Sequence, residues 1–414
     1  MASIELSRRQ VLRLAGAGAL LAGGWPGSAA AQARPGAGAS LRIWSNHPEW
    51  KDALRRNLDA FEQSTGIKIA LEPKPGPEYL QILSTTMQAG EGPDQPGIPP
   101  GPLVLQFFKS GYIADLTGKV HAERLVDLVQ PRVVRDGKVL GAPFGKYTVG
   151  IYYHTEVFAK HGLKEPRTWD DFKAVCQTLK KASLVPLMMP ARDGVIPAFY
   201  YMLAASSVMG PAGFAGLPAG KRKLTDPDVV AAAQLLLDLA PYYPEGFAGI
   251  SYAEGKATFA RGGTAMILGG TADYAGYVAV NKDVKLDFFA FPPPGASAGV
   301  PATVSGLELI YTVNAKSRHV EAATRFVDWL TTPESNRLFA NSITLPTVKG
   351  VVPGNNPIWA KQVQEAQHDV PTWRDVDATA PVWTALTRNM QAVLLNQLKP
   401  AELAQRAQAA LVVS

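Results

Sequence analysis

Apolar residues recur at two different spacings along the chain, which predicts strands and helices in turn. Residues 41–44 form a short apolar run that leads into polar residues, as expected of a buried strand followed by a loop. Apolar residues from Trp50 to Phe61 then recur at helical spacing, and Gly66 ends the predicted helix. Residues 67–71 alternate as a second strand. A strand, a helix and a strand in this order predict a βαβ unit and a parallel sheet with a right-handed crossover.

The same alternation continues over the rest of the chain. Further predicted helices cover residues 79–89, 169–181, 228–239, 319–330, 382–397 and 401–412, and further predicted strands cover residues 150–153, 264–268 and 307–313. The helix at 169–181 is preceded by Thr168, whose hydroxyl can cap it, and has acidic residues in its first turn. Proline-rich stretches at 93–102 and 292–301 are predicted to be loops within domains. The length of 414 residues favours two domains.

The start of the chain has the plan of an export signal. A basic stretch at 7–13 precedes a short apolar core at 14–25 and then a run of small residues. This order predicts a signal over residues 1–31 that is cleaved off. Arg8 and Arg9 before a core rich in Gly and Ala are similar to a twin-arginine signal, although signals of the general secretory route also carry paired arginines. A membrane anchor is disfavoured, because a bilayer needs about 20 strongly apolar residues.

The single cysteine, Cys176, limits what can be attached to the chain or cross-linked within it. No cysteine follows the apolar core of the signal, so we expect a protein without a lipid anchor, soluble in the periplasm or secreted, with residues 32–40 as a flexible lead-in. One cysteine also excludes an intramolecular disulfide. Cys176 lies on the apolar face of the helix predicted at 169–181, so we expect a buried, unreactive thiol.

Charge and motif content argue against several function classes. The 41 Lys and Arg exceed the 35 Asp and Glu by only six and form no basic stripe, so no nucleic-acid partner is expected. The six histidines have no i,i+4 pair, and no phosphate-binding loop occurs, so we expect no metal and no cofactor. Residues 295–299 fit the G-x-S-x-G pattern of serine hydrolases, but prolines on both sides prevent the strand–turn–helix that this motif requires. We therefore expect a loop there and no enzyme.

Seven segments of the chain carry a further signal through their sequence and their order. One is Phe-Glu-Gln-Ser-Thr-Gly-Ile-Lys-Ile at 61–69, and another is the Gly-Tyr-x-x-x-Leu turn at 111–116. The full set covers residues 61–69, 87–94, 111–116, 152–172, 255–257, 263–270 and 321–334. In this order, the segments resemble the extracellular solute-binding proteins of carbohydrate importers, the group that includes maltose-binding protein. The chain departs from the family pattern at 95–102, where a Pro-rich stretch replaces a short apolar run after Asp94.

This resemblance implies an α/β, two-lobed periplasmic-binding-protein fold, in which each lobe is a mostly parallel sheet flanked by helices and the ligand lies in the cleft between the lobes. The lobes would comprise residues 41–145 plus 290–340, and 146–289 plus 341–414. The resemblance also implies a monomer that binds a carbohydrate and delivers it to the membrane permease subunits of an ABC transporter.

Two other functions stay open from the residues alone. The first is binding of another solute, such as a polyamine or ferric ion, because Tyr200 and Tyr201 are similar to the paired tyrosines of iron-binding relatives. The second is an exported carbohydrate-active enzyme, whose two carboxylates a single sequence does not reveal.

A sugar offers hydroxyl groups to polar side chains and C–H faces to aromatic rings, so its site mixes both kinds of residue. Position and resemblance give Trp44, Asn46, His47, Glu78, Asp94, Tyr147, Asp273, Tyr274, Trp373, Arg374 and Trp383 as candidate ligand-binding residues. Core packing is the alternative for Trp44 and Trp383, and a cap or turn is the alternative for Glu78 and Asp94. Trp373 is expected to be exposed, since it lies in a polar loop.

Overall fold

The computed structural model describes residues 38–74, 78–294, 301–354, 356–366 and 369–413. The predicted export signal at 1–31 and the serine motif at 295–299 lie outside these residues. The chain divides into two units, Met1–Arg34 and Pro35–Ser414, and everything below concerns the second.

The predicted βαβ unit is confirmed at the start of this unit. Strand β1 (Ser40–Ser45) pairs in parallel with β2 (Lys68–Pro73), and α1 (Lys51–Thr65) connects them. Gly66 ends α1 with a φ of 73°, a left-handed conformation that glycine adopts without strain.

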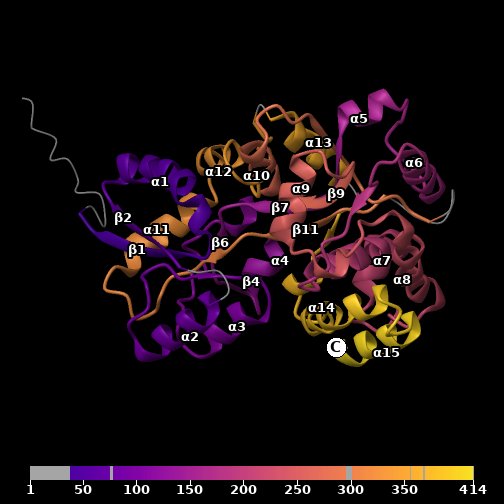
Figure 1. Cartoon of the computed structure of the whole chain (residues 1–414). Helices are drawn as coiled ribbons and strands as arrows, with labels where there is room; N and C mark the ends of the chain where they lie inside the picture. The colour runs from indigo at the N-terminus through magenta and orange to yellow at the C-terminus, as the bar shows by residue number, and fades with distance from the viewer. Residues whose placement is uncertain (1–37, 75–77, 295–300, 355, 367–368, 414) are drawn as a thin grey trace, which may run out of the picture. The chain divides into compact units, whose positions relative to one another are not determined.

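The elements of the N-terminal part pack around a first hydrophobic core, formed by residues 41–144 and 307–351 (Figure 1). Its further helices are α2 (Tyr79–Ala89), α3 (Pro102–Lys109), η2 (Ala122–Arg124), α4 (Gln130–Val133), α11 (Val320–Leu330) and α12 (Pro333–Ala340), with η1 (Pro48–Trp50) before α1. Its further strands are β3 (Gly97–Ile98), β4 (Val134–Arg135), β5 (Lys138–Val139), β6 (Ala142–Pro143) and β12 (Ile310–Tyr311). Strand β12 lies between β3 and β6 and is antiparallel to both.

A second hydrophobic core is formed by residues 149–291, Val304 and residues 370–411. It packs against one face of a six-stranded sheet in the order β13-β11-β7-β9-β8, with β10 also paired to β7. These strands are β7 (Lys146–His154), β8 (Leu187–Met188), β9 (Met266–Gly270), β10 (Leu286–Phe289), β11 (Val304–Leu307) and β13 (Val370–Pro371). A smaller third core around Tyr152 and Trp359 lies on the same sheet.

Helices cover this sheet, and Figure 1 shows α14 and α15 beside α7 and α8. The helices of this part are α5 (Thr155–Lys160), α6 (Trp169–Lys181), α7 (Val195–Gly216), α8 (Pro227–Asp238), η3 (Ala240–Tyr242), η4 (Phe247–Gly249), α9 (Tyr252–Ala260), α10 (Asp273–Val280), α13 (Pro357–Glu365), η6 (Trp373–Asp375), α14 (Ala380–Leu394) and α15 (Pro400–Ala410). The predicted cap of α6 is confirmed, because the Thr168 hydroxyl accepts a hydrogen bond from the Asp171 amide. Cys176 is buried on this helix, as expected.

The expectation of a mostly parallel sheet is corrected for the six-stranded sheet, which is mixed. Strand β7 is antiparallel to β9, β10 and β11, whereas only the β8–β9 and β11–β13 pairs are parallel. The physical reason lies in the chain path. Strand β7 enters this part of the molecule from the first core and β11 returns toward it, so the two strands run in opposite directions.

The chain passes between the two large cores three times, at 144–149, 304–307 and 351–370. The second passage breaks the single strand predicted at 307–313. Strand β11 ends at Leu307 in the six-stranded sheet, and β12 begins at Ile310 in the three-stranded sheet. The two residues between, Glu308 and Leu309, belong to neither strand because the chain changes sheets there.

Helix α7 is the one described helix that is long and apolar enough to cross a membrane, judged by length and composition only. Most of it is buried against the second core, and buried core helices of soluble proteins pass the same test. Gly210 and Pro211 kink it near its end.

Candidate functional site

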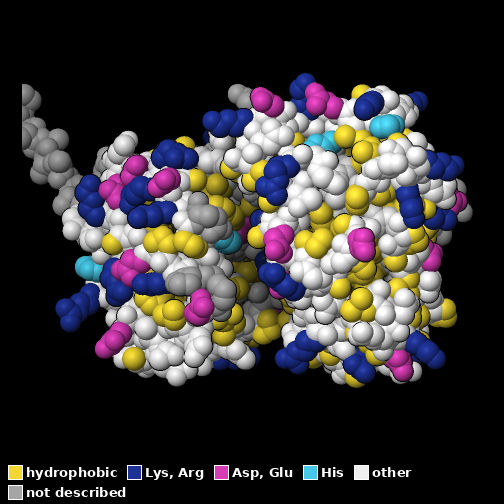
Figure 2. Space-filling view, in the orientation of Figure 1, with side chains coloured by type: hydrophobic (Ala, Val, Ile, Leu, Met, Phe, Trp, Pro, Cys, Tyr) yellow, Lys and Arg dark blue, Asp and Glu magenta, His cyan; other side chains and the backbone are white. Residues whose placement is uncertain are grey.

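A pocket with a volume of about 330 Å³ is lined by elements of both large cores. Figure 2 shows the surface hollowed between these elements, with hydrophobic side chains along the walls. The lining residues are Asn46, His47, Trp50, Pro99, Pro100, Tyr147, Val149, Val195, Ile196, Phe199, Tyr252, Leu268, Gly270, Thr271, Ala272, Asp273, Leu307, Glu308, Leu309 and Arg374.

Two adjacent strands form the floor of this pocket. Side chains two residues apart on a strand share a face, so β7 presents Tyr147 and Val149, and β9 presents Leu268 and Gly270. The strands are in register here, with Val149 opposite Gly270. On the other edge of β7, Gly306 lies opposite Tyr147, and a Cβ atom at 306 would lie 2.1 Å from the tyrosine ring. Gly306 therefore makes room for the Tyr147 side chain.

The start of α7 forms an aliphatic and aromatic wall with Val195, Ile196 and Phe199. Gly194 caps this helix with a φ of 68°, and a Cβ atom there would lie 1.9 Å from the carbonyl oxygen of Thr387. Glycine therefore allows the close approach of α7 to α14. Phe199 also meets Trp383 of α14 edge to face, with ring centroids 4.8 Å apart, which fixes the phenylalanine ring.

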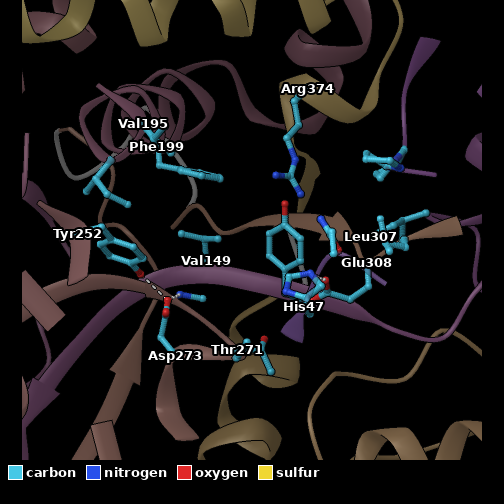
Figure 3. A pocket seen from close by; sticks show the side chains of 18 of the residues that line it. His47, Val149, Val195, Phe199, Tyr252, Thr271, Asp273, Leu307, Glu308 and Arg374 are labelled. Carbon is cyan, nitrogen blue, oxygen red and sulfur yellow. Dashed lines mark hydrogen bonds and ion pairs between the residues drawn. The ribbon is translucent and has the colours of Figure 1, made fainter. Parts of the chain in front are cut away.

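Asp273 holds Tyr252 in place at one end of the pocket. Its Oδ2 atom accepts hydrogen bonds from the Tyr252 hydroxyl and from the Gly270 amide, the latter at 2.8 Å (Figure 3). Its Oδ1 atom pairs with Lys256 Nζ at 3.1 Å. Burial and the Asp273 carboxylate raise the pKa of Tyr252 well above its ordinary value, so the phenol stays protonated and donates.

Charged and polar groups gather at the other end of the pocket. Arg374 extends from η6 into the pocket (Figure 3), with its guanidinium carbon 5.4 Å from the centroid of the Tyr147 ring. Its Nε atom donates to Asp375 at 3.1 Å. His47 Nε2 lies 3.7 Å from Glu308 Oε2. The His47 ring stacks on Trp50 with centroids 3.8 Å apart.

Two oxygen atoms in the pocket are shielded from solvent and have no hydrogen-bond partner of good geometry among the described residues. They are Asn46 Oδ1 and the Tyr147 hydroxyl. A buried polar atom without a partner costs about 1–3 kcal/mol, so each atom would gain from a ligand that supplies a hydrogen bond.

The structure brings five of the eleven candidate residues together. Asn46, His47, Tyr147, Asp273 and Arg374 all line the pocket, although they come from four separate segments of the chain.

Three of the other candidates occupy structural positions in the first part of the molecule. Trp44 is 3% exposed, and its Nε1 atom donates to Glu72 at 2.8 Å. Asp94 accepts hydrogen bonds from the Arg42 amide and the Ser317 hydroxyl. Glu78 lies at the exposed start of α2, away from the pocket.

The remaining three candidates pack in or beside the cores of the second part. Tyr274 packs against the third core, and Trp383 lies behind Phe199. The expectation that Trp373 is exposed is wrong, because its side chain is 0% exposed. Trp373 begins η6, which packs on α14, and follows β13, which packs on α7, and its indole lies beside the rings of Tyr201 and Phe214.

Sequence reasoning missed several pocket residues, above all Trp50, Phe199, Tyr252 and Glu308. The first three lie in apolar patterns typical of helices or their starts, where core packing is the ordinary interpretation. Glu308 falls within the strand predicted at 307–313 and was therefore not considered as a pocket residue. An acid within an apolar run was the one available signal.

The residues that the structure describes give little support for binding of a metal ion. No group of three or more His, Cys, Asp or Glu among these described residues could hold a metal ion. Tyr200 and Tyr201 are 0% and 1% exposed, and the Tyr200 hydroxyl donates to the Met188 carbonyl inside the second core.

Solved structures similar to this chain share its fold. A chitin oligosaccharide binding protein superposes with a TM-score of 0.75 at 23% identity, over 90% of this chain and 97% of that chain. The solute-binding protein RafE in complex with raffinose gives a TM-score of 0.72 at 21% identity, over 89% of this chain and 100% of that chain. These likenesses confirm the two-lobed α/β fold.

Curated proteins with similar sequences are binding proteins as well. A multiple sugar-binding protein of Streptococcus mutans is 25% identical over 324 residues, 75% of this chain and 76% of that protein. The diacetylchitobiose binding protein DasA of Streptomyces coelicolor is 26% identical, over 65% of this chain and 63% of that protein. The pattern of bacterial extracellular solute-binding proteins matches residues 44–337, and the chain belongs to this family.

Proposed function

We propose that this protein captures a saccharide outside the cytoplasmic membrane and delivers it to the permease subunits of an ABC importer. The observation that carries the proposal is the composition of the pocket. Buried, unpaired oxygen atoms of Asn46 and Tyr147 lie together with a guanidinium group and aromatic rings. Hydroxyl groups of a sugar can both donate to those oxygens and accept from Arg374, while the C–H faces of the ring contact the aromatic side chains. The names of the relatives, which include sugar-binding proteins, support the same class of ligand.

The two large cores would be the cores of two lobes. The resemblance implies residues 41–145 plus 290–340 for one lobe and 146–289 plus 341–414 for the other. The cores favour boundaries later than 290 and 340, because Phe291 and Val304 pack in the second core and Val351 packs in the first. A ligand touched from both sides binds the closed arrangement better than the open one and shifts the population toward it. A difference of about 3 kcal/mol favours closure roughly a hundredfold. Small-angle scattering should then show a smaller radius of gyration with the bound sugar, and an unchanged radius would contradict closure.

The remaining parts of the proposal follow from the sequence. Residues 1–31 would direct export by the twin-arginine route and then be removed, which leaves a soluble, monomeric protein without a lipid anchor in the periplasm or outside the cell. The protein would return its sugar unchanged. Release of shortened products from an oligosaccharide, above a heat-inactivated control, would contradict this part.

A thermal-shift screen tests the function directly, since a ligand that binds only the folded state raises the melting temperature. The panel should contain mono- to tetrasaccharides, with polyamines and ferric ion as the competing ligand classes. At least one saccharide should raise the melting temperature of the mature protein. A response to polyamines or ferric ion alone would overturn the proposal.

The variant Asn46→Ala then tests the site. Loss of one hydrogen bond should weaken binding about fivefold or more, measured by calorimetry. Asn341→Ala, an exposed asparagine outside this pocket, is the matched control and should bind as the parent does. If Asn46→Ala and the parent bind the sugar with equal affinity, the pocket is not the sugar-binding site.

A further inference from the structure

The two ends of the pocket differ in chemistry. Figure 3 shows Val195, Phe199 and Val149 together at one end, and His47, Glu308 and Arg374 at the other. Leu268 and Ile196 complete the apolar end, whose residues all belong to β7, β9 and the start of α7.

The polar groups nearest the apolar end already make hydrogen bonds or ion pairs within the protein. Both oxygens of Asp273 accept from protein donors, and the Tyr252 hydroxyl is the donor to one of them. The hydroxyl of Thr271 accepts from the Thr148 amide and is fully buried. The two shielded oxygens of the pocket that have no partner of good geometry among the described residues, by contrast, belong to Asn46 and Tyr147.

This division has a consequence for a sugar ring that spans the pocket. A hydroxyl group placed against Val149, Val195 and Phe199 would lose its water without gaining a partner, which weakens binding by about fivefold or more. A methyl group at the same place would instead bury apolar surface and strengthen binding by about fourfold. Together these effects favour the methyl group by roughly tenfold or more.

We propose that the pocket selects a saccharide that carries a methyl-bearing substituent, with the methyl group against the wall formed by Val149, Val195 and Phe199. The methyl group can be the C-methyl of a deoxy sugar or the acetyl methyl of an N-acetylated sugar. This inference rests on the proposed capture of a saccharide and specifies its substrate class.

Matched pairs of sugars test the proposal by calorimetry on the mature protein. The deoxy pairs are D-fucose with D-galactose and L-rhamnose with L-mannose. The acetyl pairs are N-acetyl-D-glucosamine with D-glucose and diacetylchitobiose with cellobiose. The methyl-bearing member of at least one pair should bind about tenfold tighter than its partner. A preference in the deoxy pairs identifies a C-methyl group, and a preference in the acetyl pairs identifies an acetyl methyl group.

The substitution Val195→Thr ties the preference to the wall, because threonine has nearly the shape of valine but replaces a methyl group by a hydroxyl. Val195 is 39% exposed, so the change should not disturb folding. The preference within the responding pair should fall by about fourfold or more. Val363→Thr, on α13 and also 39% exposed, is the matched control and should keep the parent preference.

The outcomes separate the two proposals. If saccharides bind but no methyl-bearing member is preferred, or if Val195→Thr keeps the parent ratio, capture of a saccharide stands and the selection of a methyl group is wrong. If no saccharide of any kind binds, both are wrong.

Discussion

Replacing Asp273 by asparagine should reduce both stability and ligand affinity, because this carboxylate organises one end of the pocket. It accepts from the Tyr252 hydroxyl, the Gly270 amide and Lys256 Nζ. Hydrogen bonds to a charged group contribute about 1.5–3 kcal/mol, against about 0.5–1.5 kcal/mol for a neutral pair. The Lys256 pair counts for less, since the lysine side chain is 33% exposed and water screens it. Asp273→Asn should therefore lower the free energy of unfolding by about 1–3 kcal/mol.

The effect on binding comes from Tyr252. Without the charged acceptor, the tyrosine hydroxyl is free to turn or to compete for ligand hydroxyls, and the ring loses its fixed position. We expect affinity for the tightest-binding sugar of the screen to fall about tenfold, which corresponds to about 1.4 kcal/mol. Denaturant unfolding and calorimetry measure the two quantities separately.

A double-mutant cycle with Tyr252→Phe isolates the proposed interaction. Once the hydroxyl is gone, Asp273→Asn should cost about 1 kcal/mol less in stability than in the parent, because residues in contact are coupled. The control is Asp170→Asn, whose carboxylate is 83% exposed and pairs with one lysine, and it should change stability by less than about 0.5 kcal/mol. Purely additive effects of the Asp273 and Tyr252 substitutions would refute the reasoning.

Three further predictions concern other parts of the molecule. Burial raises the pKa of Cys176 to about 12, so the native protein at pH 8 should not react with a thiol reagent until it is denatured, and rapid labelling of the folded protein would contradict the buried position. Burial tends to raise the pKa of Glu72, but hydrogen bonds from Arg42, Lys74 and Trp44 outweigh it and lower the pKa to about 2. The stabilisation from the ionised Glu72 is thus fully present above the ordinary pKa of 4.5 and is lost as the pH falls toward 2. The urea midpoint of the variant Glu72→Gln should therefore decline less between pH 7 and pH 3 than that of the parent. Parallel curves of urea midpoint against pH for the two proteins would refute this prediction. Replacing Arg8 and Arg9 together by lysine should leave unprocessed precursor in the cytoplasm on a gel, and normal processing would exclude the twin-arginine route while leaving export intact.

Helices and strands with a long regular pattern were predictable from the sequence, whereas the point at which an extended segment changes from one sheet to another was not. The helix predicted at 169–181 is present with its cap, and that predicted at 319–330 differs by one residue at its start. The strand predicted at 307–313 is broken because Leu307 and Ile310 pair with different sheets. That break depends on contacts with segments more than a hundred residues away, which local periodicity does not contain.

The candidate site divides along a similar line. Asn46 and His47 were found because they close the first strand, where the family usually has ligand contacts, and Tyr147 because the family has a polar contact at that point. Arg374 was found only because it lies beside Trp373 in a polar stretch before the last helices. Trp373 was misjudged because polar neighbours suggest a surface loop, although the indole is fully buried. A tryptophan thus needs its tertiary surroundings before packing can be told from stacking on a ligand.

The passages between the two cores also position the pocket, which links ligand contact to the relative placement of the cores. Tyr147 lies on one passage and Glu308 directly follows another, and the Glu308 amide donates to the Gly145 carbonyl at 3.1 Å, which connects the two chain segments. The Leu307 amide donates to Asp375 at 2.9 Å, and Asp375 in turn accepts from Arg374. These bonds hold Tyr147, Glu308 and Arg374 together as a connected group, whereas Asn46 and His47 directly follow β1 of the first part. If the cores close as proposed, a ligand that contacts both this group and Asn46 or His47 would favour the arrangement of the cores in which both sets of side chains reach it.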